Sequence, residues 1–98
     1  MAILEITIIP LGTGTTSASR FVAEAYRKIR ESGLNFELTP TATVIEGDID
    51  QLFQLAKEIH ETPFTMGVKR VVTVIKIDDR RDKEITLEGK KQSVLKKV

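Results

Sequence analysis

The order in which strand-like and helix-like segments follow one another constrains this chain more than any other feature. Alternating apolar residues with β-branched side chains predict strands, and apolar residues at helical spacing predict helices. A hairpin signal with a proline in its turn lies in the middle of the chain. The predicted segments are, in order, a strand Ile3–Ile9, a helix Ala18–Ser32, strands Asn35–Thr39 and Ala42–Glu46, a helix from Ile49 to Thr62-Pro63, and a strand Arg70–Asp78.

This βαββαβ order predicts an α+β fold, a ferredoxin-like sandwich of four antiparallel strands with two helices on one face. We expect Leu4, Ile6 and Ile8 to face those helices, and Gly33 to end the first of them. The length of 98 residues suits one domain, 1–98. An additional C-terminal helix is predicted, with Thr86 as N-cap. Its narrow apolar stripe comprises Leu87, Lys91, Val94, Leu95 and Val98.

Composition excludes several classes of function. The chain has no cysteine, so disulfides, thiolate metal sites and thiol nucleophiles are absent. Its single histidine, His60, has no partner for a metal site and is predicted at a partly exposed helix end. A net charge of +1 and a sheet with Phe36 as its one aromatic argue against nucleic-acid binding. The longest apolar runs, such as Val71–Ile75, are too short to span a membrane, and no signal peptide is visible. We therefore expect a cytoplasmic protein. We also expect no metal and no cofactor.

The face of the sheet away from the two helices is too apolar to be left in water. Ile3 and Ile9 lie on it, and the strand Arg70–Asp78 is apolar on both faces. That strand is also a long, proline-free edge, which favours pairing with another chain. We therefore expect the C-terminal helix to cover part of this face, and a homodimer or homotetramer to form through the edge strand and the open sheet face.

The loop Pro10–Arg20 joins the first strand to the first helix and is rich in hydroxyl groups. It holds two glycines and five serine or threonine residues. Glycines let the backbone approach a ligand closely, and the N–H groups that open a helix favour polar or anionic groups. The alternative is that Thr16 or Ser17 is only the N-cap of the helix.

Four motifs resemble one known family. They are Ile8-Ile-Pro-Leu-Gly-Thr13 followed by Ser17-Ala-Ser19, then Thr43-Val-Ile-Glu-Gly47, then Arg70 to Asp82, and finally Lys91 to Lys96. Together they span nearly the whole chain and resemble the thiamine-binding, YkoF-like family. The resemblance implies a ferredoxin-like subunit that assembles into dimers and tetramers and binds thiamine or its hydroxymethylpyrimidine portion without catalysis. The family often has Pro-Met-Gly-Thr where this chain has Pro40-Thr41-Ala42-Thr43, so Ala42 is expected to narrow or reshape a pocket.

Such a ligand needs hydrogen-bond acceptors for its amino group, hydroxyl partners for its ring nitrogens and a carboxylate for its cationic ring. Three of the candidates have a structural alternative. Glu5 is equally consistent with an ion pair at a subunit interface, Glu46 with a solvated strand end, and Thr43 with ordinary strand packing. The candidate ligand-binding residues are Glu5, Thr7, Thr13, Ser17, Ser19, Thr43 and Glu46.

Two other classes of function remain as alternatives. The first is a ligand-responsive regulatory or interaction module with a different small-molecule effector. The loop Pro10–Arg20 would bind this effector at a subunit interface. The second is an enzyme of the acylphosphatase type, which needs an arginine and an asparagine around a phosphate. Arg20 is present, but Asn35 is the only asparagine and is poorly placed, so we expect no catalytic residues and no enzyme activity. The charged run Asp78–Asp82 is predicted to pair within itself rather than to hold a metal.

Overall fold

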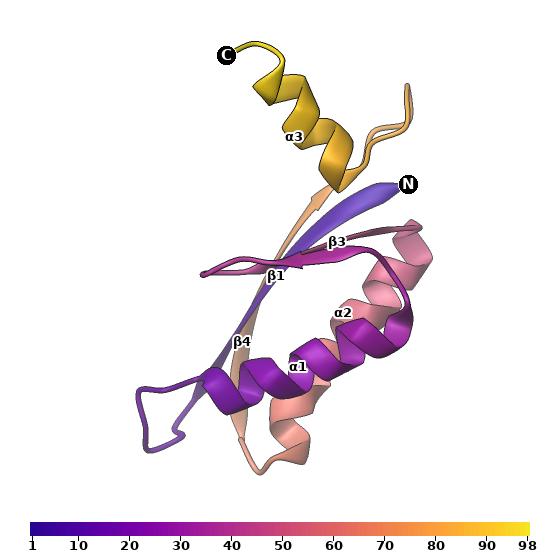
Figure 1. The fold of residues 1–98 in the computed structure, drawn as a ribbon. Helices are drawn as coiled ribbons and strands as arrows, with labels where there is room; N and C mark the ends of the chain where they lie inside the picture. The colour runs from indigo at the N-terminus through magenta and orange to yellow at the C-terminus, as the bar shows by residue number, and fades with distance from the viewer.

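A four-stranded antiparallel sheet carries two helices on one face, the predicted ferredoxin-like α+β arrangement (Figure 1). The computed structural model describes all residues, 1–98. The strand order is β2-β3-β1-β4, which confirms the prediction that Arg70–Asp78 is an edge strand. The elements are β1 (Ala2–Leu11), α1 (Ser19–Ser32), β2 (Phe36–Leu38), β3 (Thr43–Gly47), α2 (Ile49–Thr65), β4 (Arg70–Asp78) and α3 (Leu87–Leu95). None of the helices has both the length and the apolar character needed to cross a bilayer.

The main core lies between the sheet and the pair α1 and α2. Leu4 and Ile6 of β1 are buried there, with Ile8 packed at the margin, as the alternation predicted. Burial of each such side chain stabilises the fold by about 1.5–3 kcal/mol. The helices contribute Ala25 and Ile29 from α1 and Leu52, Leu55, Ala56 and Ile59 from α2.

The first helix begins without a side-chain cap. Its N-cap is Ala18, so the prediction that Thr16 or Ser17 caps the helix is wrong. The Ser17 hydroxyl lies 3.2 Å from the Ser19 hydroxyl and is used inside the loop. The other end agrees with the prediction, because Gly33 adopts the left-handed conformation with φ of 74°.

The second helix does not end at Thr62-Pro63 as predicted but continues to Thr65. In a helix, the N–H of each residue donates to the carbonyl four residues before it. Pro63 has no N–H, so the carbonyl of Ile59 lacks its usual backbone donor. The Thr62 hydroxyl donates to that same carbonyl at 2.7 Å and so replaces the missing bond. Pro63 itself is almost fully buried, and its own carbonyl accepts from Met66 and Val68. Local hydrogen bonding therefore tolerates the proline in the last turn.

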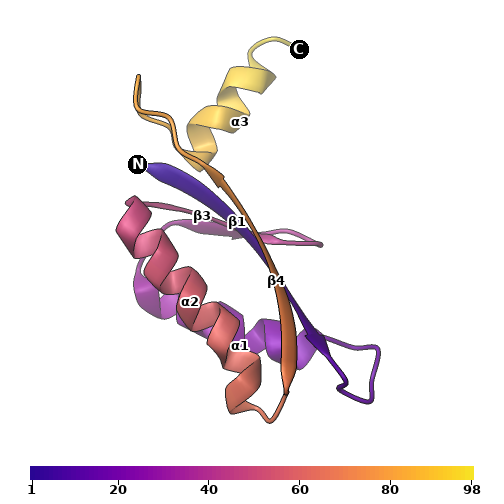
Figure 2. The ribbon, with the colours of Figure 1, turned by 180° about the vertical axis from the view of Figure 1, so that it is seen from behind.

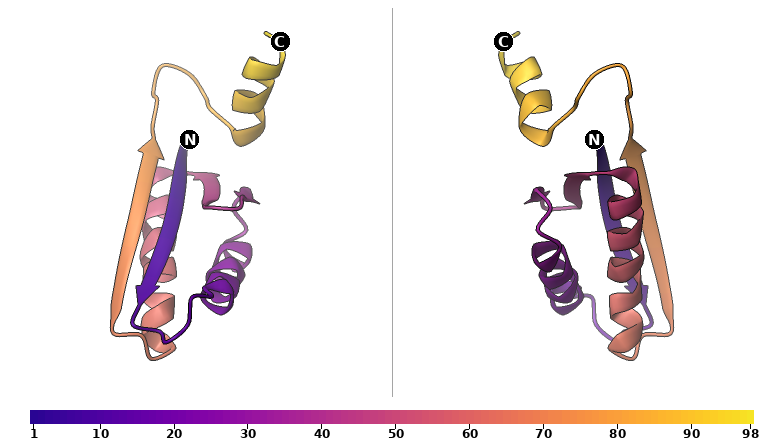
Figure 3. Two further views of the ribbon diagram at one scale, coloured as in Figure 1. Left: turned by 90° about the vertical axis from the view of Figure 1, so that its left-hand side faces the viewer. Right: turned by 90° about the vertical axis from the view of Figure 1, so that its right-hand side faces the viewer.

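Helix α3 stands apart from the two-helix layer, beyond the end of the sheet where the N-terminus lies (Figures 2 and 3). Thr86 is its N-cap as predicted, and its hydroxyl accepts from the Gly89 N–H at 2.9 Å. Leu87 alone is buried, and it forms a small second cluster with Ile3 and Ile85. The expected apolar stripe is wrong beyond this point, because Val94, Leu95 and Val98 are all exposed.

The face of the sheet opposite α1 and α2 is only partly covered. Near the start of β1, the Leu87 cluster shields Ile3, as expected of the C-terminal helix. Further along, Ile9 pairs with Val72 in the β1–β4 register, and both are 41% exposed. Val74 on the same face is 55% exposed, and Leu11 is 38% exposed. We call these four residues, Ile9, Leu11, Val72 and Val74, the open-face patch.

Candidate functional site

An apolar cavity of about 220 Å³ opens between α1, the middle of β1 and the turn that joins β2 to β3. Its wall is mostly aliphatic, and the turn residues form one side of it. Ligand sites of this kind are apolar, with a few polar groups that set orientation. The lining residues are Ile6, Thr7, Ile8, Ala18, Val22, Ala25, Ile29, Leu38, Thr39, Pro40, Thr41, Ala42, Thr43 and Ile59.

The threonines around this cavity differ in what their hydroxyl groups do. Thr7 donates to the carbonyl of Thr41 at 3.1 Å, and Thr39 donates to the carbonyl of Ala42 at 2.7 Å. The first bond ties the β2–β3 turn to β1, and the second closes the turn itself. Thr43 is only 8% exposed, yet its hydroxyl makes no hydrogen bond within the chain. It is therefore a nearly buried polar group in the cavity wall that remains available to a ligand.

The turn residues other than Thr43 were not among the candidates derived from the sequence. Thr39 and Thr41 alternate with Pro40 and Ala42, which gives three hydroxyl residues in five positions. That repetition was the available signal, but a proline-containing turn reads first as a connection between strands. Ala42 lies in the wall of the cavity, where the family resemblance predicted that it would affect a pocket.

Glu5 and Glu46 lie on the other face of the sheet and are thus separated from Thr43. Glu5 is half-buried and lines a shallow cleft of about 310 Å³ beneath α3, together with Lys76, Lys90 and Lys91. Within the chain it forms no ion pair, while Lys90 pairs with Asp78 at 2.6 Å. Its carboxylate is thus free to pair with a ligand in this cleft or with a residue of another subunit.

The carboxylate of Glu46 is engaged on both oxygens. Asn35 Nδ2 donates to one oxygen at 2.8 Å, and the backbone N–H of Leu87 donates to the other at 2.7 Å. Glu46 is only 9% exposed, so the alternative of a solvated strand end is wrong. The side chain fixes the first residue of α3 to β3, and a ligand that used it would have to share these bonds.

Thr13, Ser17 and Ser19 all lie in or beside the loop Leu11–Ala18, and their hydroxyls bond locally. Thr13 donates to the carbonyl of Thr15 at 2.9 Å, and Ser17 contacts Ser19. The loop borders the apolar cavity only through Ala18. The structure thus gathers Thr7 and Thr43 at one cavity, leaves Glu5 and Glu46 on the opposite face, and keeps the three loop residues apart from both.

The single histidine is tied to the sheet. His60 is half-buried on α2, and its Nδ1 lies 2.6 Å from the Thr73 hydroxyl of β4. Its ring also meets Phe64 edge-on, with the ring centres 5.5 Å apart. These contacts link the second helix to the edge strand.

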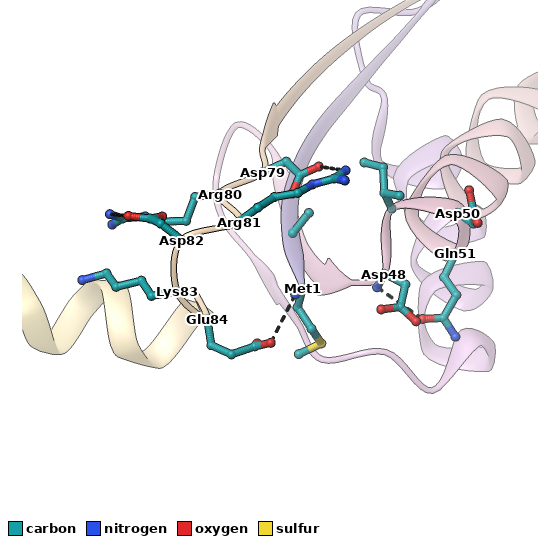
Figure 4. Close-up of a pocket in the computed structure, with 12 residues that line it drawn as sticks. Met1, Asp48, Asp50, Gln51, Asp79, Arg80, Arg81, Asp82, Lys83 and Glu84 are labelled. Atoms are coloured by element: carbon teal, nitrogen blue, oxygen red, sulfur yellow. Dashed lines mark hydrogen bonds and ion pairs between the residues drawn. The ribbon is translucent and has the colours of Figure 1, made fainter.

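A polar cleft of about 680 Å³ lies between the start of β1, the start of α2 and the loop after β4 (Figure 4). The two arginines in its lining pair with aspartates of the same loop. Arg80 donates two hydrogen bonds of 2.6 Å to Asp82, and Arg81 pairs with Asp79 at 2.8 Å, which confirms the predicted self-pairing. Arg80 lowers the pKa of Asp82 to about 2, and Arg81 lowers the pKa of Asp79. Both arginines of the cleft are thus occupied by neighbouring carboxylates.

Comparison with known proteins identifies relatives over the full length of the chain. The model of a family described as thiamine-binding protein matches residues 4–95. UPF0045 protein YqgV of Bacillus subtilis is 48% identical over 98% of this chain and 96% of its own length. A UPF0045 protein of Methanothermobacter thermautotrophicus is 39% identical over the whole of both chains.

Solved structures show the same fold. The crystal structure of hypothetical protein MJ1052 of Methanocaldococcus jannaschii superposes with a TM-score of 0.88, at 40% identity, over 95% of this chain and 94% of the other. A Thermotoga maritima protein described as a candidate for thiamine biosynthesis or salvage superposes with a TM-score of 0.79 over 95% and 97%. At 24% identity, this second likeness concerns the fold alone.

Proposed function

The chain belongs to the thiamine-binding protein family, and from that premise we propose that it binds thiamine or the hydroxymethylpyrimidine portion of thiamine without catalysing a reaction. The pyrimidine ring occupies the apolar cavity between α1 and the β2–β3 turn. Aliphatic side chains from both sides of the cavity, such as Val22 and Leu38, contact the faces of the ring.

The free hydroxyl of Thr43 is the observation that carries this proposal. No buried side-chain polar atom of the structure lacks a partner, so this hydroxyl still reaches the cavity space, where a ligand can exchange hydrogen bonds with it. The aminopyrimidine ring offers both acceptor nitrogens and an amino donor, so a hydroxyl, which donates and accepts, is a suitable partner. Ala42 beside it sets the width of the entrance and so the size of ring that enters.

The binding form is a homodimer or homotetramer. The open-face patch and the unpaired edge of β4 support this assembly, because such apolar area and a free strand edge favour association. Two copies that bury this patch against each other also remove its exposed valines from water.

Isothermal titration calorimetry of the assembled protein with thiamine, and separately with hydroxymethylpyrimidine, tests the proposal. Saturable binding of at least one is expected. Thr43→Val keeps the shape and removes the hydroxyl, so it is expected to weaken binding by about threefold to tenfold, whereas Thr43→Ser keeps the hydroxyl and the affinity. No binding of either compound to the assembled protein refutes the proposal. Light scattering with and without ligand separates simple binding from the regulatory alternative, in which the oligomeric state responds.

A further inference from the structure

Besides the apolar cavity, the N-terminal end of α1 borders another cleft, and this one is cationic. Its volume is about 660 Å³, and it is enclosed by the end of β1, the first turn of α1 and the connection from α2 to β4. Figure 3 shows that the connection from β1 to α1 and the connection from α2 to β4 lie at the same end of the molecule, remote from α3. The lining residues are Leu11, Gly12, Thr13, Arg20, Phe21, Met66, Gly67, Val68, Lys69 and Arg70.

The cleft gathers three cationic side chains, Arg20, Lys69 and Arg70, and its lining contains no acidic residue. None of the three forms an ion pair within the chain, in contrast to Arg80 and Arg81 at the opposite end. A protein with 15 basic and 14 acidic residues has enough carboxylates to pair these cations. Their concentration in one concave place without counter-charges creates a local positive potential.

The backbone around the cleft is also suited to an anion. Gly12 and Gly67 both have positive φ, 71° and 91°, and no atom lies within 4 Å of where a Cβ would stand, so a ligand can approach the chain closely. The N–H groups of Gly12 and Thr13 donate to no acceptor within the chain. The Arg20 guanidinium rests 4.9 Å from the centre of the buried Phe21 ring, which holds it at the mouth of the cleft.

We propose that this cleft binds a phosphate group, either as the free ion or carried as a monoester on a small molecule. Arginine guanidinium groups match phosphate oxygens with paired hydrogen bonds, and Lys69 adds a point charge. The Gly12 and Thr13 N–H groups supply neutral donors to the remaining oxygens. A carboxylate has only two oxygen atoms, so it would leave some of these hydrogen-bond donors unused. No covalent step is involved.

The inference is independent of the apolar cavity and of thiamine itself, which carries no phosphate. An amide NMR titration of the assembled protein with inorganic phosphate, and a second with thiamine monophosphate, each at constant ionic strength maintained with sodium chloride, tests it. Saturable shifts are expected at Gly12, Thr13 and Gly67 in at least one titration. Binding of inorganic phosphate identifies the free ion as sufficient, and binding of the ester alone shows that the group must be carried on a ligand.

The double variant Arg20→Gln/Arg70→Gln is expected to weaken the saturable binding by about tenfold or more, because each removes a charge-assisted hydrogen bond. The matched control Lys28→Gln/Lys57→Gln removes the same charge from exposed positions of α1 and α2 outside the cleft, and is expected to keep the affinity. Absence of saturable shifts with both compounds overturns the proposal. Equal weakening in both double variants also overturns it, since the effect would then reflect net charge alone.

Discussion

Thr43 and Glu46 lie three positions apart on β3 and therefore point to opposite faces of the sheet. Thr43 reaches the cavity beneath α1, and its hydroxyl is free, whereas Glu46 reaches the other face, and both of its oxygens accept hydrogen bonds. Two residues that look alike as polar strand positions thus differ in availability. Strand alternation accounts for the different faces, but only the contacts show which of the two hydrogen-bonding groups still lacks a partner within the chain.

Replacing Glu46 by glutamine is expected to destabilise the protein. The variant loses the charge and one of two acceptors, so Asn35 or the Leu87 N–H is left without a partner, at a cost of about 1–3 kcal/mol. Urea unfolding measures the change. Glu58→Gln is the control, because Glu58 is exposed on α2 and makes no hydrogen bond or ion pair. Equal stability of the Glu46→Gln protein and the parent would contradict the structural role.

The pKa of Asp82 is expected to lie near 2, well below its ordinary value of 3.8, because Arg80 donates to both carboxylate oxygens. The lowered pKa means that the pair favours the folded state above about pH 4 and that this contribution disappears as the pH falls through 3.8 toward 2. A carbon-detected NMR titration of the carboxyl group measures the midpoint. In the Arg80→Gln variant the midpoint should rise toward 3.8, and an unchanged midpoint would show that the pair does not persist in solution.

Hydrogen bonds at the ends of the helices explain where the sequence-based boundaries failed. The capping residue Thr86 and the terminal Gly33 were predictable, since each acts through its own backbone or side chain. The continuation of α2 past Pro63 was not, because it depends on Thr62 satisfying the Ile59 carbonyl. Ala18 as an N-cap was equally unpredictable, since it offers no capping group and the serines beside it bond within the loop.

The Thr62 hydroxyl is expected to stabilise α2 only because Pro63 follows it. Thr62→Val should cost about 1–3 kcal/mol in the parent, since a buried carbonyl loses its partner. In a Pro63→Ala background the alanine N–H bonds to Ile59, so the same change should cost clearly less. Thermal or urea unfolding of the four proteins gives the coupling energy. Equal costs in both backgrounds would contradict this explanation of the helix end.

At the scale of the whole molecule, the order of the elements predicted the fold, but it did not predict the cavity or the cationic cleft. The βαββαβ order and the alternation in β1 were enough for the sheet, its edges and the side that the helices cover. The cavity draws its wall from α1, β1 and the β2–β3 turn, and the cationic cleft joins Arg20 to Lys69 and Arg70, about half the chain away. Such groupings depend on how the elements meet, which no local pattern encodes.

The proposed assembly is expected to depend on the open-face patch. Val74→Glu places a charge within this patch and should yield a species with the mass of one chain in light scattering, because burial of an unpaired carboxylate is costly. Phe53→Glu is the control, since Phe53 is 53% exposed on α2 in the helix layer, and it should leave the mass unchanged. A parent protein that is already monomeric at micromolar concentration would refute the assembly itself.

The central claim is that a thiamine-type pyrimidine binds in the cavity beside Thr43, and a methyl-resolved NMR titration with thiamine tests it most directly. Saturable shifts are expected for methyl groups of the cavity wall, such as those of Val22, Ile29 and Leu38. The methyl groups of Val94 and Val98 on the distant C-terminal segment should stay unchanged. Saturable shifts that leave the cavity wall unaffected, or no saturable shift at all in the assembled protein, would contradict the claim.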